Sequence, residues 1–329
     1  MECEYDLVVI GSGPAGLAAG IAAGRRGLEA VVFERESVGG ELVNRHSIAD
    51  LPGHPESTGP ELRSTLVDQL QAVGGRIHLA TVDDIERMDG EPNGGEIDSG
   101  SGPNGDDAGD GGTPVGFEVD TTEGVHTTRT VVVATGSRPI PLTVPGADAY
   151  RDCGIFHCAM CDGPLYAGEV VAVSGSDEWA LADALYLAEH AERVVVIEEG
   201  ARPSAGESLR ERVADHPDIE VRTDTEIRAV DGADVLERLE LFDRIEGTGY
   251  DEAVGGLYVQ HGVEPEASVL PEWVPRTDCG AVAVDRSLET AVPGLFAAGD
   301  VRESSPRTVV AALGDGVTAC RSATRYLER

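Results

Sequence analysis

The chain has 329 residues, of which 60 are Asp or Glu and 25 are Arg, with no Lys, and its formal net charge at pH 7 is -35. So acidic a surface repels nucleic acids and anionic membranes, and we exclude both as partners. We interpret the acidity as halophilic adaptation to a salty cytoplasm, because the Debye length falls to about 3 Å at 1 M salt and self-repulsion is then screened.

Residues 5–34 predict a strand, a glycine turn, a helix and a second strand. The run Leu7–Ile10 is uniformly apolar, as expected for a strand that is buried on both faces. The Ala-rich stretch after Gly16 is typical of a helix that packs closely on a sheet, and the sequence AVVFE (30–34) predicts the second strand. Together they predict a βαβ unit.

The turn of this unit reads GSGPAG and supplies Gly11, Gly13 and Gly16. In a dinucleotide-binding turn the first glycine allows the tight turn, the second lets the backbone approach a pyrophosphate, and the third lets helix and strand pack closely. Glu34 ends the second strand, where a carboxylate can accept hydrogen bonds from ribose hydroxyls. A strand before the turn, a helix after it and this acid make the motif a specific signal for a dinucleotide.

Further strands are predicted at 76–88, 115–124 and 130–136. Residues 89–114 are rich in Gly, Asp and Pro without periodicity, so we expect a disordered loop there. The Pro-rich stretch that follows, up to residue 146, predicts a crossing between domains, and a second crossing is expected near 256–267. Residues 294–329 predict a strand, a loop and a helix.

A second βαβ pattern covers residues 169–199 and can be laid over the first without gaps. Gly11 matches Gly175 and Glu34 matches Glu198. The glycine and the glutamate are 23 residues apart in each pattern. The predicted fold class is therefore α/β, with two Rossmann-like dinucleotide-binding domains, the second inserted into the first. We expect one domain over 1–138 and 263–329, and the inserted domain over 139–262.

Two cysteines, Cys158 and Cys161, stand just before the second pattern. No signal peptide or membrane-spanning run is recognised, so we expect a cytoplasmic protein, where a close cysteine pair is more often catalytic or metal-binding than structural. The spacing favours a redox-active dithiol. Three weaker interpretations stay open: a zinc site, which lacks a second pair; an iron–sulfur cluster, since Cys153 completes a C-x4-C-x2-C spacing; and coincidental buried thiols.

The motifs VVIGSGPAGLAAG, GGELVNRHSIADLPGHPESTGPEL, VVVATGSRP, CAMCDG and GLFAAGDV occur in this order, and with them the chain resembles the low-molecular-weight thioredoxin reductases over nearly its whole length. The resemblance implies a homodimer with FAD bound to the first domain. By matched position, it implies that these residues hold FAD: Gly11, Ser12, Gly13, Pro14, Ala15, Gly16, Glu34, Gly40, Leu42, Gly299, Asp300, Arg307, Thr308 and Val309.

The same resemblance assigns roles around the cysteine pair. Cys161 would face the flavin and accept its electrons, and Cys158 would attack the disulfide of a thioredoxin-like partner. Asp162 would be the acid/base group for the leaving thiolate. Independently of the resemblance, His157 precedes Cys158 and could shift the pKa of that thiol, although a lone histidine is more often a solvated or hydrogen-bonded residue. All four residues lie in the stretch HCAMCDG.

The second glycine turn departs from the family pattern. It reads GSDEWA, so Asp177 stands where the backbone has to approach a pyrophosphate, and Glu178 and Trp179 add charge and bulk. NADPH use is therefore in doubt, and ferredoxin becomes a candidate electron donor. The leading prediction is a FAD-dependent disulfide reductase acting on a thioredoxin-like protein. The alternatives are an NAD(P)H-dependent thioredoxin reductase, a dithiol oxidase that passes electrons to oxygen, and a redox-sensing flavoprotein without turnover.

Overall fold

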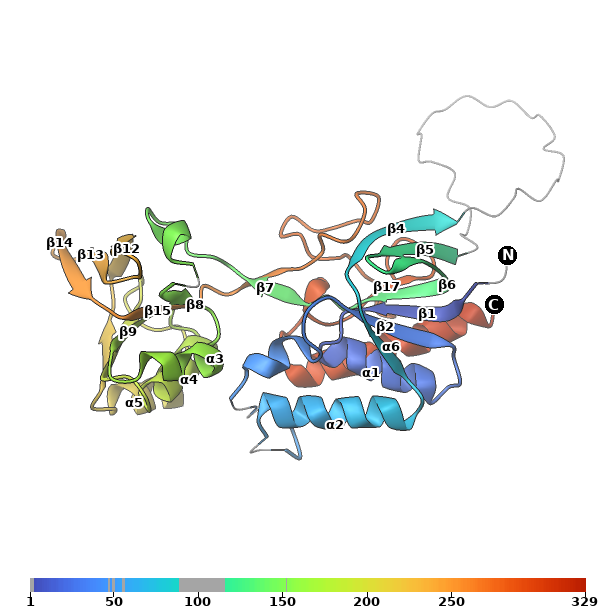
Figure 1. Ribbon diagram of the computed structural model, residues 1–329, viewed down its shortest axis with the longest axis horizontal. Helices are drawn as coiled ribbons and strands as arrows, with labels where there is room; N and C mark the ends of the chain where they lie inside the picture. The colour runs from blue at the N-terminus through green and yellow to red at the C-terminus, as the bar shows by residue number, and fades with distance from the viewer. Residues whose placement is uncertain (1–2, 47, 49–50, 55–56, 89–115, 152) are drawn as a thin grey trace, which may run out of the picture. The chain divides into compact units, whose positions relative to one another are not determined.

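The computed structural model describes residues 3–46, 48, 51–54, 57–88, 116–151 and 153–329 (Figure 1). They form two compact α/β units: the first comprises Met1–Val43, Ser47–Ser137 and Pro265–Arg329, and the second comprises Asn44–His46 and Arg138–Glu264. The predicted fold class is confirmed. The assignment of FAD to 1–138 and 263–329, and of a nicotinamide-binding-like role to 139–262, stays a prediction. The loop predicted at 89–114 lies outside the described residues.

The first unit is built on one sheet with the strand order β3-β2-β1-β6-β5-β4, and β17 also pairs with β6. Its strands are β1 (Tyr5–Ile10), β2 (Ala30–Glu34), β3 (Arg76–Leu79), β4 (Val82–Met88), β5 (Gly116–Thr121), β6 (Gly124–Val133) and β17 (Leu295–Ala297). The stretch predicted as one strand over 76–88 is two strands, because β3 joins β2 in parallel whereas β4 pairs antiparallel with β5.

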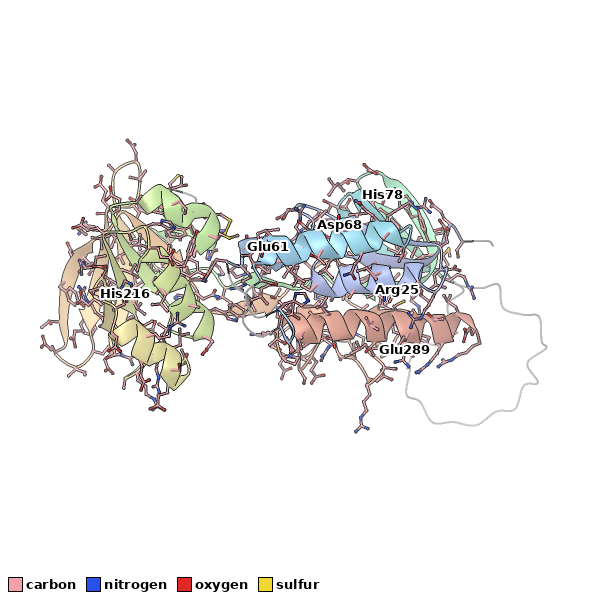
Figure 2. The ribbon with its side chains drawn as sticks, turned by 90° about the horizontal axis from the view of Figure 1, so that it is seen from below. Arg25, Glu61, Asp68, His78, His216 and Glu289 are labelled. Carbon is pink, nitrogen blue, oxygen red and sulfur yellow. A yellow bond between two sulfur atoms is a disulfide. The ribbon has the colours of Figure 1, made fainter. Side chains whose placement is uncertain are left out.

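Three helices of the first unit lie side by side, with α1 (Pro14–Gly24) between α2 (Gly59–Ala72) and α6 (Val309–Leu327), as Figure 2 shows. Glu61, labelled in that figure, closes a capping box with Thr58 at the start of α2. Strand alternation divides the core: Leu7 and Val9 belong to the cluster that includes these helices, and Val8 and Ile10 belong to the cluster on the other face. Two short 3-10 turns, η1 (Gly40–Asn44) and η4 (Gly299–Val301), complete the described helical segments of the first unit, although Asn44 itself groups with the second unit.

The second unit has a five-stranded parallel sheet in the order β11-β10-β9-β15-β8. Its strands are β8 (Ile155–Phe156), β9 (Val170–Ser174), β10 (Arg193–Ile197), β11 (Ile219–Arg222) and β15 (Gly256–Val259). One face packs against α3 (Ala159–Asp162), α4 (Glu178–Leu187) and α5 (Glu207–Ala214). The other face packs against the antiparallel strands β12 (Thr225–Asp231), β13 (Arg238–Asp243) and β14 (Thr248–Ala253).

The remaining described elements are short: η2 (Ala147–Tyr150), η3 (Gly163–Tyr166) and the strands β7 (Ser137–Pro139) and β16 (Val263–Pro265). Strands β7 and β16 pair with each other, so the two crossings of the chain run side by side. In the described part of the chain, no helix is both long and apolar enough to cross a membrane.

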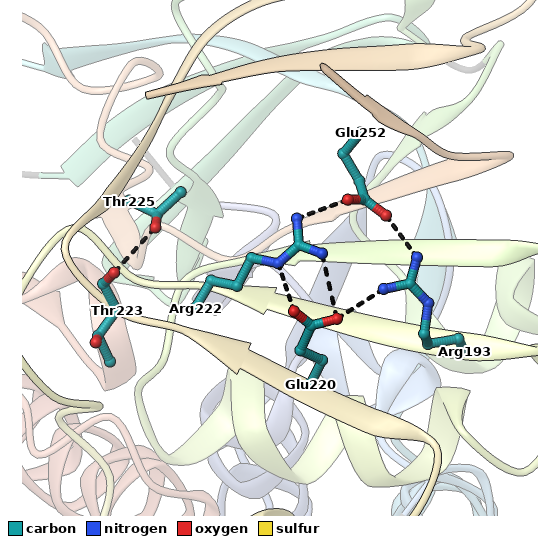
Figure 3. A network of polar contacts seen from close by, with 6 residues as sticks. All are labelled: Arg193, Glu220, Arg222, Thr223, Thr225 and Glu252. Atoms are coloured by element: carbon teal, nitrogen blue, oxygen red, sulfur yellow. Dashed lines mark hydrogen bonds and ion pairs between the residues drawn. The ribbon is translucent and has the colours of Figure 1, made fainter. Parts of the chain in front are cut away.

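An ion-pair network ties the two sheets of the second unit together (Figure 3). Glu252 of β14 accepts hydrogen bonds of 2.6 Å from Arg193 of β10 and from Arg222 of β11. Glu220 binds the same two arginines, and its hydrogen bonds to Arg222 lower the pKa of its carboxyl. Four groups with complementary charge thus fix the antiparallel strands to the parallel sheet.

Candidate active site

The first glycine turn has the backbone that the sequence motif predicts. Gly11 lies at φ +96°, and a Cβ there would stand 2.4 Å from the Ala134 carbonyl oxygen. A Cβ on Gly16 would stand 1.8 Å from the Gly11 carbonyl oxygen, so only glycine permits this approach of α1 to β1. A Cβ on Gly13 would meet nothing within 4 Å, and no side chain caps α1 there. The N-terminus of α1 therefore faces open space.

Glu34 is only 8% exposed, and its buried carboxylate is held in this turn by hydrogen bonds. Its Oε2 accepts from the Ser12 amide at 2.9 Å and from the Ser12 hydroxyl at 2.6 Å, and its Oε1 accepts from the Glu36 amide at 3.0 Å. A carboxylate has about four acceptor sites, so lone pairs are left for a ribose hydroxyl.

Two other glycines predicted to hold FAD lie beside the turn. A Cβ on Gly40 would be 3.1 Å from the Gly13 Cα, and a Cβ on Gly299 would be 3.0 Å from the Ala15 Cβ. Leu42 is different, because it is 1% exposed and packs in the core cluster with α1. Its side chain supports the turn, so only its backbone could face a ligand.

The last four predicted FAD residues follow β17. Asp300 accepts a hydrogen bond of 2.9 Å from Ser305. Arg307 is exposed at φ +56°, Thr308 caps α6 by accepting from the Ala311 amide, and Val309 is the first residue of α6. These residues shape the start of the helix at the predicted place.

The first unit therefore fits FAD. The observation that carries this is the uncapped N-terminus of α1 beside open space, where backbone N–H groups and the helix dipole favour a diphosphate. Pro14 at the first helical position has no N–H, so the donors would come from the residues that follow it.

The second glycine turn repeats the first in its backbone. Gly175 lies at φ +122°, and a Cβ there would be 2.1 Å from the Gln260 carbonyl oxygen. Ser176 donates to Glu198 as Ser12 donates to Glu34, across the same separation of 22 residues. The structure therefore repeats the hydrogen-bond pattern of the first βαβ unit in the second.

Asp177 breaks the repeat at the position that matters for a dinucleotide. It has the backbone of Gly13, with φ -72° and ψ -178° against -64° and -175°. Its carboxylate caps α4 by accepting from the Ala180 amide at 2.8 Å. Burial raises the pKa of this carboxyl, against its hydrogen bonds to backbone amides. The chain's own carboxylate engages backbone donors that a diphosphate would use, so a dinucleotide would have to displace it at this turn.

Cys158 and Cys161 form a disulfide, with their Cα atoms 5.3 Å apart. Cys158 is the N-cap of the four-residue helix α3, and its sulfur accepts from the Cys161 amide at 3.0 Å. Cys161 is exposed, so an external partner can reach the pair. Cys153 is a free, exposed thiol. Among the described residues, no three His, Cys, Asp or Glu side chains gather as metal ligands.

The two polar neighbours of the pair differ in what they contact. Asp162 ends α3 directly after Cys161 and is half-buried. The pKa of Tyr166 is raised mainly by burial, and the charge of Asp162 raises it further. His157 donates from Nδ1 to the Val259 carbonyl at 3.0 Å, so its ring is fixed on β15. This bond gives His157 the structural role that is the more frequent one for a lone histidine.

Two residues near the disulfide were missed by sequence reasoning. Leu165 follows in η3 and is 77% exposed, which is unusual for a large apolar side chain. The Oδ1 atom of Asn44 lies 3.6 Å from the Cys161 sulfur, although the residues are 117 positions apart. The pattern CDGPLY could have drawn attention to Leu165, but no local signal points to Asn44.

Comparison with known proteins agrees with this geometry. The family model described as pyridine nucleotide-disulphide oxidoreductase matches residues 5–316. The thioredoxin reductases of Peptoclostridium acidaminophilum and Treponema pallidum are each 29% identical to the chain, which they match over 100% of its length and over 98% and 99% of their own. The crystal structure of Lactococcus lactis thioredoxin reductase has a TM-score of 0.87 at 26% identity, with 99% of both chains covered.

Proposed function

The chain belongs to the pyridine nucleotide-disulphide oxidoreductase family, among its low-molecular-weight thioredoxin reductases, and from this premise we propose that it reduces a thioredoxin-like protein through Cys158 and Cys161 with a donor other than NADPH. It is a FAD oxidoreductase, as the family's members are. The observation that carries the proposal is the contrast between an open helix N-terminus at Gly13 and one capped by Asp177.

FAD, when bound, supplies a two-electron relay for the disulfide. The Cys158–Cys161 bond takes up two electrons and breaks. The Cys158 thiolate then attacks a sulfur of the partner's disulfide, which forms a mixed disulfide and expels the partner's other sulfur as a thiolate. Asp162 passes a proton to that sulfur, and Cys161 attacks Cys158 to release the partner as a dithiol. Each turnover restores the disulfide and consumes two electrons and two protons.

The charge of the second turn supports a protein donor rather than a nicotinamide. A phosphate at about 4 Å from a carboxylate is repelled by about 4 kcal/mol at an effective dielectric near 20, before screening by salt. Asp177 presents one such carboxylate to a diphosphate, and Glu198, which follows β10, presents another to the 2′-phosphate of NADPH. Reduced ferredoxin delivers single electrons and needs no dinucleotide site, so two equivalents would serve one turnover.

The surface beside the disulfide supports a protein acceptor. Leu165, four residues after Cys161 in the sequence, is exposed, and a large apolar side chain gains stabilisation when a partner covers it. The same family premise leads us to propose a homodimer, and the net charge of -35 leads us to propose a salty cytoplasm as its location.

The test is an anaerobic titration of the FAD-loaded protein with NADPH, NADH and reduced ferredoxin, followed by flavin absorbance, with thioredoxin disulfide as acceptor. We expect bleaching and turnover with ferredoxin alone, and loss of turnover but not of FAD in Cys158→Ser. Rapid turnover with NADPH would refute the proposed donor. Peroxide release from a dithiol in air, without reduction of thioredoxin, would identify a dithiol oxidase. An absence of turnover with every donor would contradict the proposed reaction.

A further inference from the structure

Three consecutive residues, Asn44–His46, group with the second unit although the sequence around them belongs to the first. The Arg45 guanidinium carbon lies 3.9 Å from the centroid of the Trp179 ring. The His46 Nδ1 lies 3.3 Å from the Asp183 Oδ1. Each residue of the segment therefore has its own contact, since Asn44 reaches Cys161.

The contacts of Arg45 and His46 fall on one stripe of α4. His46 also stacks on Tyr186, with the ring centroids 4.7 Å apart. Trp179, Asp183 and Tyr186 stand at positions i, i+4 and i+7, which a helix brings to one face. We call these three residues the α4 stripe. The Trp179 ring binds the Arg45 cation, and Asp183 and Tyr186 together bind the His46 imidazole.

The middle of the stripe is rigid and buried. Asp183 is 3% exposed and accepts a hydrogen bond of 2.5 Å from the hydroxyl of Tyr258, which is 2% exposed. Burial, and then the charge of Asp183, raises the pKa of Tyr258, so this hydroxyl stays a donor. A carboxylate in such surroundings requires fixed partners, which distinguishes its contact with His46 from an ordinary surface ion pair.

We propose that the α4 stripe is a docking site for the chain's own segment Asn44–His46, and that the docked segment makes Asn44 a positioning residue for Cys161. Trp179 belongs to the turn GSDEWA and is one of the residues that depart from the dinucleotide motif. Its ring contacts Arg45 of the same chain. When the disulfide opens, the Cys161 thiol can donate a hydrogen bond to Asn44 Oδ1, which lies 3.6 Å from its sulfur and would hold the thiol in place. Arg45 and His46 hold Asn44 in place for that contact.

The first experiment measures docking at Trp179. The chain has two tryptophans, so Trp273→Phe leaves Trp179 as the sole indole. In that background, Arg45→Ala should raise the acrylamide quenching constant of Trp179 at least about twofold, because the guanidinium no longer covers the ring. Arg212→Ala, at an exposed arginine of α5, is the matched control and should change nothing. Equal quenching with and without Arg45, at unchanged circular dichroism, would refute the docking.

The second experiment measures the positioning of Cys161. In the Cys158→Ser background, the rate of alkylation of Cys161 is followed against pH by mass spectrometry of its peptide. Asn44→Ala should shift the profile to lower pH and speed alkylation at pH 7 by about threefold, because the thiol loses the oxygen that accepts its hydrogen bond. Arg45→Ala should shift the profile in the same direction. Profiles that coincide with the parent would overturn the assignment of Asn44. Neither readout uses an electron donor or a partner protein, so it can fail or succeed independently of the proposed reaction.

Discussion

Gly13 and Asp177 occupy equivalent positions with the same backbone, so exchanging their chemistry tests why one turn is open and the other capped. Gly13→Asp should fold, because a Cβ at Gly13 meets nothing within 4 Å. The new carboxylate should cap α1 as Asp177 caps α4 by its 2.8 Å bond to Ala180. FAD should then bind far more weakly, since the carboxylate engages the amides that face the diphosphate.

The loss can be estimated from two effects. One carboxylate and one phosphate charge at about 4 Å repel each other by about 4 kcal/mol at an effective dielectric near 20, and salt and partial exposure reduce this to about 1.5 kcal/mol. The hydrogen bonds that the diphosphate no longer receives contribute about 1.5–3 kcal/mol. The sum is about 4 kcal/mol, or roughly a thousandfold in the FAD dissociation constant.

The assay is calorimetric titration of the apoprotein with FAD, beside flavin content per chain and the melting temperature. Gly13→Asn is the matched control, because Asn caps a helix equally well without charge and should lose only about tenfold to a hundredfold. Gly13→Ala separates the effect of bulk, since alanine neither caps nor carries charge. If folded Gly13→Asp bound FAD as tightly as the parent, the argument that Asp177 closes the second turn would fail with it.

Three further outcomes are expected. Asp177→Asn keeps the cap and removes a carboxyl whose pKa is raised by burial from 3.8, so the parent should be less stable than the variant as pH rises above about 4. Their melting temperatures should agree near pH 3 and diverge at pH 7, and a divergence only in acid would contradict the sign. Leu165→Asp should raise the KM for thioredoxin about tenfold and leave a small aromatic disulfide unaffected; equal effects on both would argue against a contact with the partner. Glu252→Gln should lower the free energy of unfolding in urea by about 2 kcal/mol, with exposed Glu246→Gln as a neutral control, and matching losses would exclude a special role for the network.

Several features of the site were accessible from the sequence because they depend on short-range sterics. The turn at Gly11–Gly16 has the predicted backbone, and the fit to FAD rests on those glycines. The matched positions of Glu34 and Glu198 gave the internal repeat, which the structure extends to the serines that bind them. A spacing of two residues between Cys158 and Cys161 likewise brings two sulfurs within bonding reach.

Other features depend on contacts between distant residues and could not be predicted. Leu42 matches a cofactor position by motif, yet its side chain is drawn into the core by the packing of α1. Residues 76–88 have one continuous strand pattern, but pairing with two different neighbours divides it. Only one property of the turn GSDEWA could be predicted. The sequence indicated that a dinucleotide fits poorly there, but it did not indicate that Arg45 contacts Trp179.

The sequence by itself determined the two βαβ units, the glycine turns and the cysteine pair, because each is specified by a local period or by the space that one glycine leaves. The tertiary structure alone decided that α4 is capped by its own Asp177 while α1 is open, and that Asn44 lies against Cys161. A capping hydrogen bond needs a particular side-chain rotamer, and a contact across 117 residues needs the whole second unit to be folded. Neither the side-chain rotamer of Asp177 nor the contact of Asn44 produces a periodic pattern from which it could be predicted.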